Sequence, residues 1–474
     1  MAERPWKFES SRPHHLIIAD NPGTLPAMGD QASPKRKLGF AMSVALVVGN
    51  MIGAGVFLLP ASLAPLGWNS VYGWLITIAG SLCVVAVLMR LARGRADSCA
   101  PFTYPAAAFG PGTGFLVAWS YWISCWVANA TLAIAAVSNL SIIWPGLAGP
   151  GVPAAAAIGL LWLFTLVNCL GVRTAGEVQV LTTLLKLLPL GGAIFVGGWL
   201  FATGSGTLAA HDSVPISVTG VGTAATFALF AMLGFESAAA AGDRVENAER
   251  TVPRATVIGA LIAGLVYLLA CSAVTLMLPS ALVEASNAPF ATFFSTLVDP
   301  ALGPIVAVFV AIAALGALNG FVLLQAEMPL ALARGGLLPA WIARFNRNEI
   351  PYRIHIVSSG LATVVVLANY SRGLANLFQF MVLVTTSVSI ILYLACALAS
   401  FKLAREGRIA TSLGFTAITV TAFAYSAWAF YGAGIEASLW SLAMTAAAIP
   451  AYLLMRRANR SSPAAAANPA ASPE

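Results

Sequence analysis

Three glycines fall within seven consecutive residues inside one hydrophobic segment. This is the feature of the sequence best suited to bind a solute. The segment Gly49–Phe57, read as GNMIGAGVF, lies within an apolar stretch long enough to cross a membrane. Each glycine costs a helix roughly 1 kcal/mol relative to alanine, and lipid has no water to satisfy the freed backbone groups. Such a break is tolerated at membrane depth where the backbone lines a cavity. The segment therefore predicts a solute site inside a membrane protein.

The two ends of a broken helix supply the groups that an α-amino acid zwitterion needs. We expect free N–H groups around Ala54 and Gly55, at the positive end of the following half-helix, to bind the carboxylate. Carbonyls near Asn50 and Met51 can accept hydrogen bonds from the ammonium. The alternative explanation is that these glycines only allow close packing of neighbouring helices.

The composition is that of a polytopic membrane protein. Of the 474 residues, 59% are hydrophobic and 9% are charged, whereas soluble domains carry about 25% charged residues. The basic residues behind the net charge of +7 lie in short loops. They determine the membrane topology and do not indicate a nucleic-acid-binding face. The six cysteines form no CxxC pair, so neither a disulfide framework nor a metal site is expected. No P-loop motif and no catalytic set of acid, base and nucleophile is present, so ATP-driven transport and enzyme activity are not expected.

Twelve apolar stretches approach or exceed the ~20 residues that cross a bilayer. We predict spans at 39–64, 72–91, 112–144, 153–171, 177–202, 221–241, 254–279, 304–333, 354–370, 375–401, 411–431 and 435–455.

The basic residues alternate from one side of these spans to the other. All of the 25 Lys and Arg except Lys186 and Arg372 lie in the two tails or in loops that follow even-numbered spans. The positive-inside rule then places both termini in the cytoplasm.

The sixth span carries a second weak point at Phe230–Ser237, read as FAMLGFES. Carbonyls near Phe230 and Leu233 are further acceptors for an ammonium. Breaks in spans one and six are five helices apart, and an odd repeat number places two halves in opposite orientations. This is the inverted-repeat plan of many secondary transporters.

Several segments resemble the amino acid–polyamine–organocation (APC) superfamily, from about Lys37 to Arg457. The first and sixth spans carry the two broken-helix motifs just described. Further matching segments are VEN at 245–247, RTVPR at 250–254, ARGGLLP at 333–339 and YWISCWVAN at 121–129. The last of these is similar to the basic amino acid/polyamine antiporter group, and within it to the arginine:agmatine type.

The resemblance implies an all-α fold of twelve transmembrane helices. A LeuT-like 5+5 inverted repeat with broken helices one and six would be joined by two peripheral helices. The expected parts are a cytoplasmic tail at 1–36, a transporter domain at 37–457 and a second tail at 458–474. The domain would hold repeat one at 39–202, repeat two at 221–401 and helices 11–12 at 411–455. The resemblance further implies a bacterial inner membrane and leaves a homodimer open.

The resemblance also implies the residues that face the substrate. Besides Asn50, Met51, Ala54 and Gly55 these are Tyr121, Ser124, Cys125, Asn129, Leu132, Phe230, Leu233 and Phe321. Tryptophans match Phe230 and Phe321 in the arginine:agmatine type and stack on the guanidinium there, and phenylalanine makes a weaker cation–π contact. A smaller or more apolar substrate than arginine would suit this pocket at least as well.

Ionisable residues inside spans are functional candidates because burying a charge in lipid costs a few kcal/mol. Proton-coupled and cationic members of the superfamily carry a lysine at the position of Lys186, where sodium-coupled relatives bind Na⁺. An ammonium there could bridge helices one, five and eight, or serve as a fixed structural charge. Glu236 matches an acid of the sixth helix that is assigned to proton sensing or gating, and a plain hydrogen-bond donor is the alternative. Glu327 is a weaker candidate.

The sequence therefore predicts a secondary transporter that exchanges an amino acid for an amine, with membrane lipid and the substrate as its partners and no cofactor. Proton-coupled symport of neutral or cationic amino acids is the alternative, favoured by Lys186, Phe230 and Phe321. A non-transporting amino-acid sensor and a channel are less consistent with the short tails and the scarcity of polar residues in the spans.

Overall fold

The computed structural model describes residues 39–93, 102–170, 175–204, 214–235, 248–348, 350–369 and 371–460. Regular structure in these ranges is entirely helical, without any strand. The predicted tail 1–36 lies outside the described residues. The predicted tail 458–474 is described only as far as Arg460, where the last helix ends.

The helices follow one another along the chain with short connections. They are α1 (Phe40–Met51), η1 (Ala54–Phe57), α2 (Leu59–Leu63), η2 (Ala64–Leu66), α3 (Asn69–Arg93), α4 (Thr103–Phe109), α5 (Pro111–Leu140), η3 (Pro145–Ala148), α6 (Val152–Cys169), α7 (Ala175–Ala202), α8 (Val218–Met232), α10 (Ala248–Met277), α11 (Ser280–Glu284), α12 (Pro289–Leu297), α13 (Leu302–Arg334), η5 (Ala340–Ala343), α14 (Tyr352–Ala368), α15 (Leu374–Arg405), α16 (Leu413–Gly432), α17 (Gly434–Ala446) and α18 (Ala448–Arg460).

In the described part of the chain, nine helical stretches are long and apolar enough to cross a membrane. They are α3, α5, α6, α7, α10, α13, α15, α16 and the consecutive pair α17–α18. Three of the predicted spans correspond instead to shorter apolar helices, which are α1, α8 and α14. The chain is therefore a multi-pass membrane protein. Two of these three short helices, α1 and α8, are those in which the sequence predicts a break.

Both predicted breaks are present. Helix α1 ends at Met51, Ile52 leaves the helical region with ψ of 84°, and η1 begins after Gly53. Helix α8 ends at Met232, after which Leu233 is extended with ψ of 145°. The next residue, Gly234, has φ of +107°, a conformation that side chains other than hydrogen rarely allow. At 12 and 15 residues, α1 and α8 span about 18 and 22 Å, less than the roughly 30 Å hydrocarbon core.

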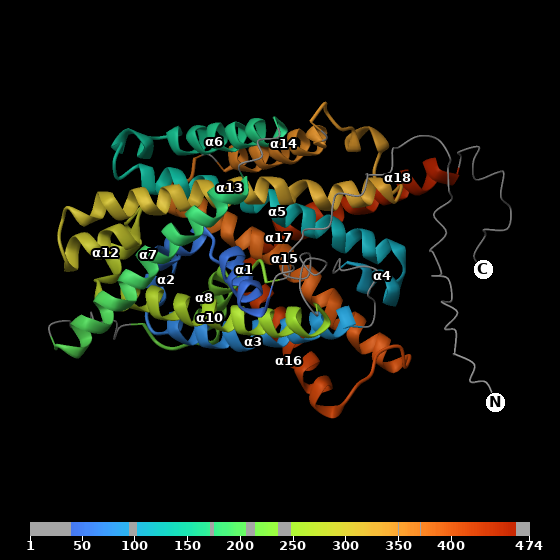
Figure 1. The fold of residues 1–474 in the computed structure, drawn as a ribbon, viewed down its shortest axis with the longest axis horizontal. Coiled ribbons are helices and arrows are strands. Elements are labelled where there is room, and N and C mark those ends of the chain that lie inside the picture. The colour runs from blue at the N-terminus through green and yellow to red at the C-terminus, as the bar shows by residue number, and fades with distance from the viewer. Residues whose placement is uncertain are drawn as a thin grey trace, which may run out of the picture. The chain divides into compact units, whose positions relative to one another are not determined.

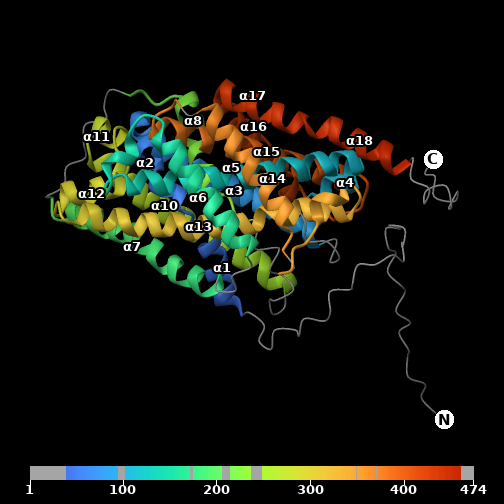
Figure 2. The same cartoon turned by 90° about the horizontal axis from the view of Figure 1, so that it is seen from above.

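The long helices pack in two groups, and the break of α1 lies between them. Helix α13 packs against α5, α6 and α14, and these four helices lie together in Figure 1. Helix α3 packs against α8, α10 and α16, and α10 also packs against α1. Helices α17 and α18 lie along one edge of this unit, opposite α1 and α7 (Figure 2). The break of α1 contacts both groups, because η1 touches α5, α13, α8 and α10.

Candidate substrate site

A small cavity lies where the two broken helices meet. Its volume is about 40 Å³, which is room for roughly three water molecules. Five elements line it, namely the α1–η1 break, α5, α8 with its break, α10 and α13. The lining residues are Met51, Gly53, Gly55, Val56, Ala128, Leu132, Phe230, Ala231, Leu233, Tyr267 and Phe321.

A close contact across the cavity joins the two breaks. A Cβ atom built on Gly55 would lie 2.3 Å from Cε1 of Phe230 and 3.0 Å from its Cζ. Only a glycine at position 55 lets the Phe230 ring approach so closely. The ring edge in turn meets the Phe378 ring of α15, with centroids 6.4 Å apart and planes at 89°. Phe230 is therefore held between the backbone of the first break and a second aromatic side chain.

The helix ends at the cavity carry partial charges in place of ionised groups. Helices α1 and α8 both present their carboxyl ends, since they end at Met51 and Met232 beside the lining residues. The last carbonyls of a helix lack intrahelical partners and carry about half a negative charge in total. The N–H of Leu233 occupies the carbonyls of Leu229 and Phe230, at 3.1 and 3.2 Å. At the end of α1, the Met51 carbonyl accepts from the Gly53 N–H at 2.7 Å. A carbonyl oxygen has two lone pairs and can accept a second hydrogen bond, so the last carbonyls of both helices can still bind a cationic group.

Tyr267 of α10 is a lining residue that the sequence interpretation missed. Its side chain is fully buried, and its hydroxyl has no hydrogen-bond partner among the described residues. The ring packs against Trp74 of α3, with centroids 5.8 Å apart. A buried tyrosine hydroxyl normally finds a partner, so this one is available to a bound solute. A tyrosine in the middle of the apolar span 254–279 is the signal that could have identified it.

Six of the predicted residues line the cavity, namely Met51, Gly55, Leu132, Phe230, Leu233 and Phe321. For Asn50 and Ala54 the backbone lies at the break, in α1 and η1, and their side chains fall outside the described part.

Of the predicted residues of α5, Leu132 lines the cavity, and the others lie beside it. Tyr121 is half-buried and Cys125 is buried. Cys125 and Tyr121 precede Ala128 by three and seven residues, which places them on the cavity-facing side of α5, one and two turns away. Ser124 donates its hydroxyl hydrogen to the Tyr121 carbonyl, at 2.7 Å.

Asn129 belongs to a buried polar network that joins four helices. Its Nδ2 donates to Oε1 of Gln325 in α13 at 2.8 Å, and Gln325 Nε2 lies 3.4 Å from Oγ of Ser359 in α14. The hydroxyls of Ser359 and Thr165 of α6 are 2.6 Å apart. These bonds hold α5, α6, α13 and α14 together, and they turn the Asn129 side chain away from the cavity. Its Oδ1 has no partner among the described residues.

Of the two predicted coupling residues, the structure describes Lys186, which is not among the residues that line the cavity. Lys186 is only 1% exposed in α7, a helix that packs against α10 and α13. Within the described ranges, no carboxylate lies within 4 Å of its ammonium. Glu236 lies outside the described residues.

Chemically, the cavity suits a small cation with an apolar body. None of the lining residues in the described part carries a charge. The walls offer two phenylalanine rings, an unpartnered phenol hydroxyl and two helix carboxyl ends. Aromatic faces and helix carboxyl ends both favour positive charge.

Comparison with known proteins identifies the family. A sequence model of the amino acid permease family matches residues 38–452. The chain belongs to the amino acid permease family. The family predicted from the sequence is thereby confirmed.

Three relatives of this permease are transporters of amines. The cadaverine/lysine antiporter of Escherichia coli (strain K12) is 32% identical over 350 residues, which is 73% of this chain and 78% of the relative. The putrescine transporter PotE of Haemophilus influenzae is 28% identical over 418 residues, 87% of this chain and 96% of the relative. PotE of Escherichia coli (strain K12) is 28% identical over 420 residues, with 86% and 94% covered.

Proposed function

We propose that this permease is a secondary active antiporter that exchanges an amino acid for an amine by alternating access. The observation that carries the proposal is the uncharged aromatic cavity at two helix carboxyl ends. Such a site binds ammonium groups by carbonyl oxygens and ring faces. The names of the relatives, a cadaverine/lysine antiporter and two putrescine transporters, agree with that chemistry.

The proposed substrate class is a linear diamine or its parent amino acid. One ammonium would lie at the ends of α1 and α8, with the alkyl chain between Phe230 and Phe321. The N–H groups that begin η1 would take the carboxylate of the amino acid. The Tyr267 hydroxyl would bind whichever polar group lies on the α10 side. Because the cavity holds only about 40 Å³, Phe230 or Phe321 must move to admit any of these molecules.

The remaining predicted site residues would act as the transporter opens. Asn50, Ala54, Tyr121, Ser124, Cys125 and Asn129 would join the substrate path in other states of the cycle. Tyr121 and Cys125 continue the cavity-facing side of α5 from Ala128, so they would line a path towards the end of the bundle where α5 begins. Glu236 would gate that path.

We propose the complete architecture of the family for this chain. The nine long helical stretches and the three short helices α1, α8 and α14 would form twelve spans. Spans one to ten would make a 5+5 inverted repeat within the transporter domain 37–457. The alternation of basic loops supports cytoplasmic termini in a bacterial inner membrane.

Proton-coupled symport is the second candidate. The burial of Lys186 favours it. The buried amine would bind and release a proton at a position that a coupling cation could otherwise occupy. In that mechanism Lys186 would alternate between charged and neutral forms as the permease cycles.

Transport by purified protein in proteoliposomes tests these alternatives. Uptake of labelled lysine and cadaverine is measured for wild type and for Lys186→Ala. Each is assayed with and without an inward proton gradient, and with and without internal counter-substrate. Antiport predicts flux that requires internal substrate and survives Lys186→Ala. Net uptake that the gradient drives and Lys186→Ala abolishes would establish the symporter instead.

A further inference from the structure

A second and larger cavity opens at one end of the bundle. We call it the outer vestibule, lined by Leu58, Ala61, Ser62, Pro65, Leu66, Ser138, Thr223, Phe227, Glu284, Ser286, Ala375, Asn376, Phe378 and Gln379. Its volume is about 260 Å³, compared with about 40 Å³ for the central cavity. It lies among the loops that carry few basic residues.

The outer vestibule and the central cavity are stacked along the same elements. On α8, Thr223 and Phe227 line the vestibule, and Phe230 one turn later lines the central cavity. On α5, Leu132 lines the central cavity and Ser138 the vestibule, about 9 Å further along the helix. The first break and α2 also pass from one cavity to the other.

Two aromatic rings lie between these cavities. Phe230 lines the central cavity, Phe378 lines the vestibule, and the two rings meet edge to face. A solute in the vestibule is therefore separated from the central cavity by this pair of side chains.

Glu284 gives the vestibule its charge. It is the single ionisable residue among the lining residues, and its exposed carboxylate has no ion-pair or hydrogen-bond partner in the described part of the chain. The amides of Asn376 and Gln379, which line the vestibule from α15, likewise make no hydrogen bond to another described residue. The vestibule thus offers one carboxylate and two amide oxygens, together with the aromatic rings of Phe227 and Phe378.

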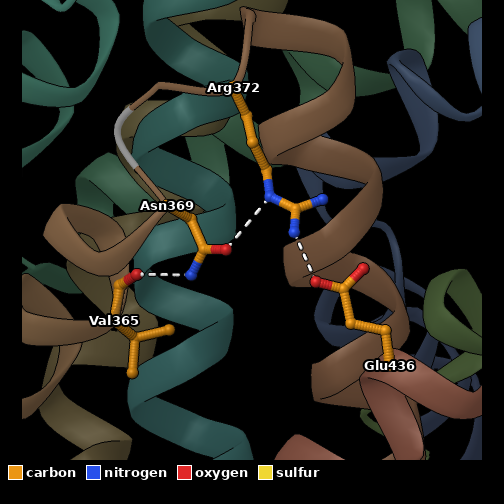
Figure 3. Close-up of polar contacts among 4 residues, drawn as sticks. All are labelled: Val365, Asn369, Arg372 and Glu436. Atoms are coloured by element: carbon orange, nitrogen blue, oxygen red, sulfur yellow. Dashed lines mark hydrogen bonds and ion pairs between the residues drawn. The ribbon is translucent and has the colours of Figure 1, made fainter.

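The one basic residue of these outer loops is already neutralised. Arg372 forms an ion pair with Glu436 of α17, and its Nε donates to Oδ1 of Asn369 at 3.0 Å (Figure 3). Its guanidinium also lies 4.6 Å from the centre of the Phe380 ring. Phe380 and Glu436 are not vestibule residues, so the arginine offers no counter-charge to Glu284.

We propose that the outer vestibule is a second amine site. An alkyl ammonium would bind Glu284 and the amides of Asn376 and Gln379, with its methylene chain on Phe227 and Phe378. It would wait there until the Phe230–Phe378 pair opens to the central cavity. This inference rests on the proposed function, since it assigns the same substrate class to a further site. A doubly charged diamine would gain more from Glu284 than an amino acid, whose carboxylate Glu284 repels.

The test measures KM separately from each side of the membrane. Right-side-out and inside-out vesicles containing wild type, Glu284→Gln or Asp299→Asn are loaded with lysine, and labelled cadaverine uptake is followed. Asp299 is the matched control, an acid of the same loop region that does not line the vestibule and accepts from the Ala301 N–H at 2.8 Å. Loss of one exposed ion pair predicts a rise of about three- to fivefold in the outer-side KM of Glu284→Gln.

The expected pattern is specific. The maximal rate and the inner-side KM stay at wild-type values, Asp299→Asn matches wild type, and the rise is smaller for lysine uptake than for cadaverine. The difference between wild type and Glu284→Gln also shrinks as the salt concentration rises, because screening weakens exposed charges. Gln379→Leu, at the lining position on α15, raises the outer-side KM as well.

Two results overturn the inference in distinguishable ways. If wild type exchanges cadaverine and Glu284→Gln keeps the wild-type outer-side KM, or Asp299→Asn raises it equally, the vestibule site is wrong and the antiporter proposal stands. If wild type exchanges neither cadaverine nor putrescine, the proposed function fails and the second amine site fails with it.

Discussion

Adding one methyl group at Gly55 tests how tightly the two breaks are packed. In Gly55→Ala the new Cβ would lie 2.3 Å from Phe230 Cε1, whereas ordinary contacts begin at 3.4 Å. The ring must therefore move by about 1 Å, against Phe378 on one side or into the 40 Å³ cavity on the other. Overpacking of this kind costs about 1–3 kcal/mol.

The same free energy sets the expected loss of binding. If Phe321 is the ring that moves to admit the substrate and Phe230 must keep its place, about 1–3 kcal/mol corresponds to roughly a 5- to 150-fold weaker affinity for cadaverine. We expect Gly55→Ala to lower the melting temperature of the solubilised protein and to reduce counterflow in proteoliposomes accordingly. Equilibrium binding of labelled cadaverine measures the affinity directly.

Two further variants make this prediction refutable. The Cβ built on Gly53 meets only the Met51 carbonyl oxygen, at 3.9 Å, and the residue has φ of −87°. Gly53→Ala should therefore leave the melting temperature unchanged. In a double-mutant cycle, Phe230→Leu should remove most of the stability cost of Gly55→Ala. Wild-type stability and affinity in Gly55→Ala, or additive effects in the cycle, would refute the packing described for the two breaks.

Three other substitutions give graded results. Tyr267→Phe removes only the unpartnered hydroxyl, so the melting temperature should stay unchanged. The KM for cadaverine should rise about fivefold, because one lost hydrogen bond costs about 1 kcal/mol. An unchanged KM would exclude that hydroxyl from the site. Gln325→Leu leaves the buried Asn129 amide without its partner and should destabilise the solubilised protein by about 1–2 kcal/mol. An unchanged melting temperature would show that the network does not hold the helices together. Arg372→Gln removes an ion pair whose side chains are 32% and 58% exposed, so the free energy of unfolding should fall by less than about 1 kcal/mol. A larger loss in thermal unfolding would contradict that exposure.

The breaks were predictable because glycine has a local effect on a helix. Gly53, Gly55 and Gly234 mark the ends of α1 and α8 in the sequence, and the structure ends both helices there. Phe230 and Phe321 were likewise predictable as cavity residues, since they follow from the position of the breaks and from the family resemblance.

The direction of individual polar side chains was less predictable. Asn129 lies on an apolar span and was expected in the cavity, but its amide finds Gln325 on a neighbouring helix. The direction of the Asn129 side chain depends on how α5 packs against α13, and no local pattern in the sequence encodes that packing. Tyr267 was missed for the same reason, because span 254–279 shows no break and only packing turns its hydroxyl to the cavity. The vestibule combines residues from five distant segments, so it emerges only in three dimensions.

Counterflow of labelled cadaverine is the most direct test of the central claim that this permease exchanges an amine for an amino acid. Proteoliposomes containing the purified protein are either loaded with lysine or left empty, at equal pH on both sides. The proposed function predicts rapid cadaverine uptake into the lysine-loaded vesicles and almost none into empty ones. Equal uptake into both, or none into either, would contradict it.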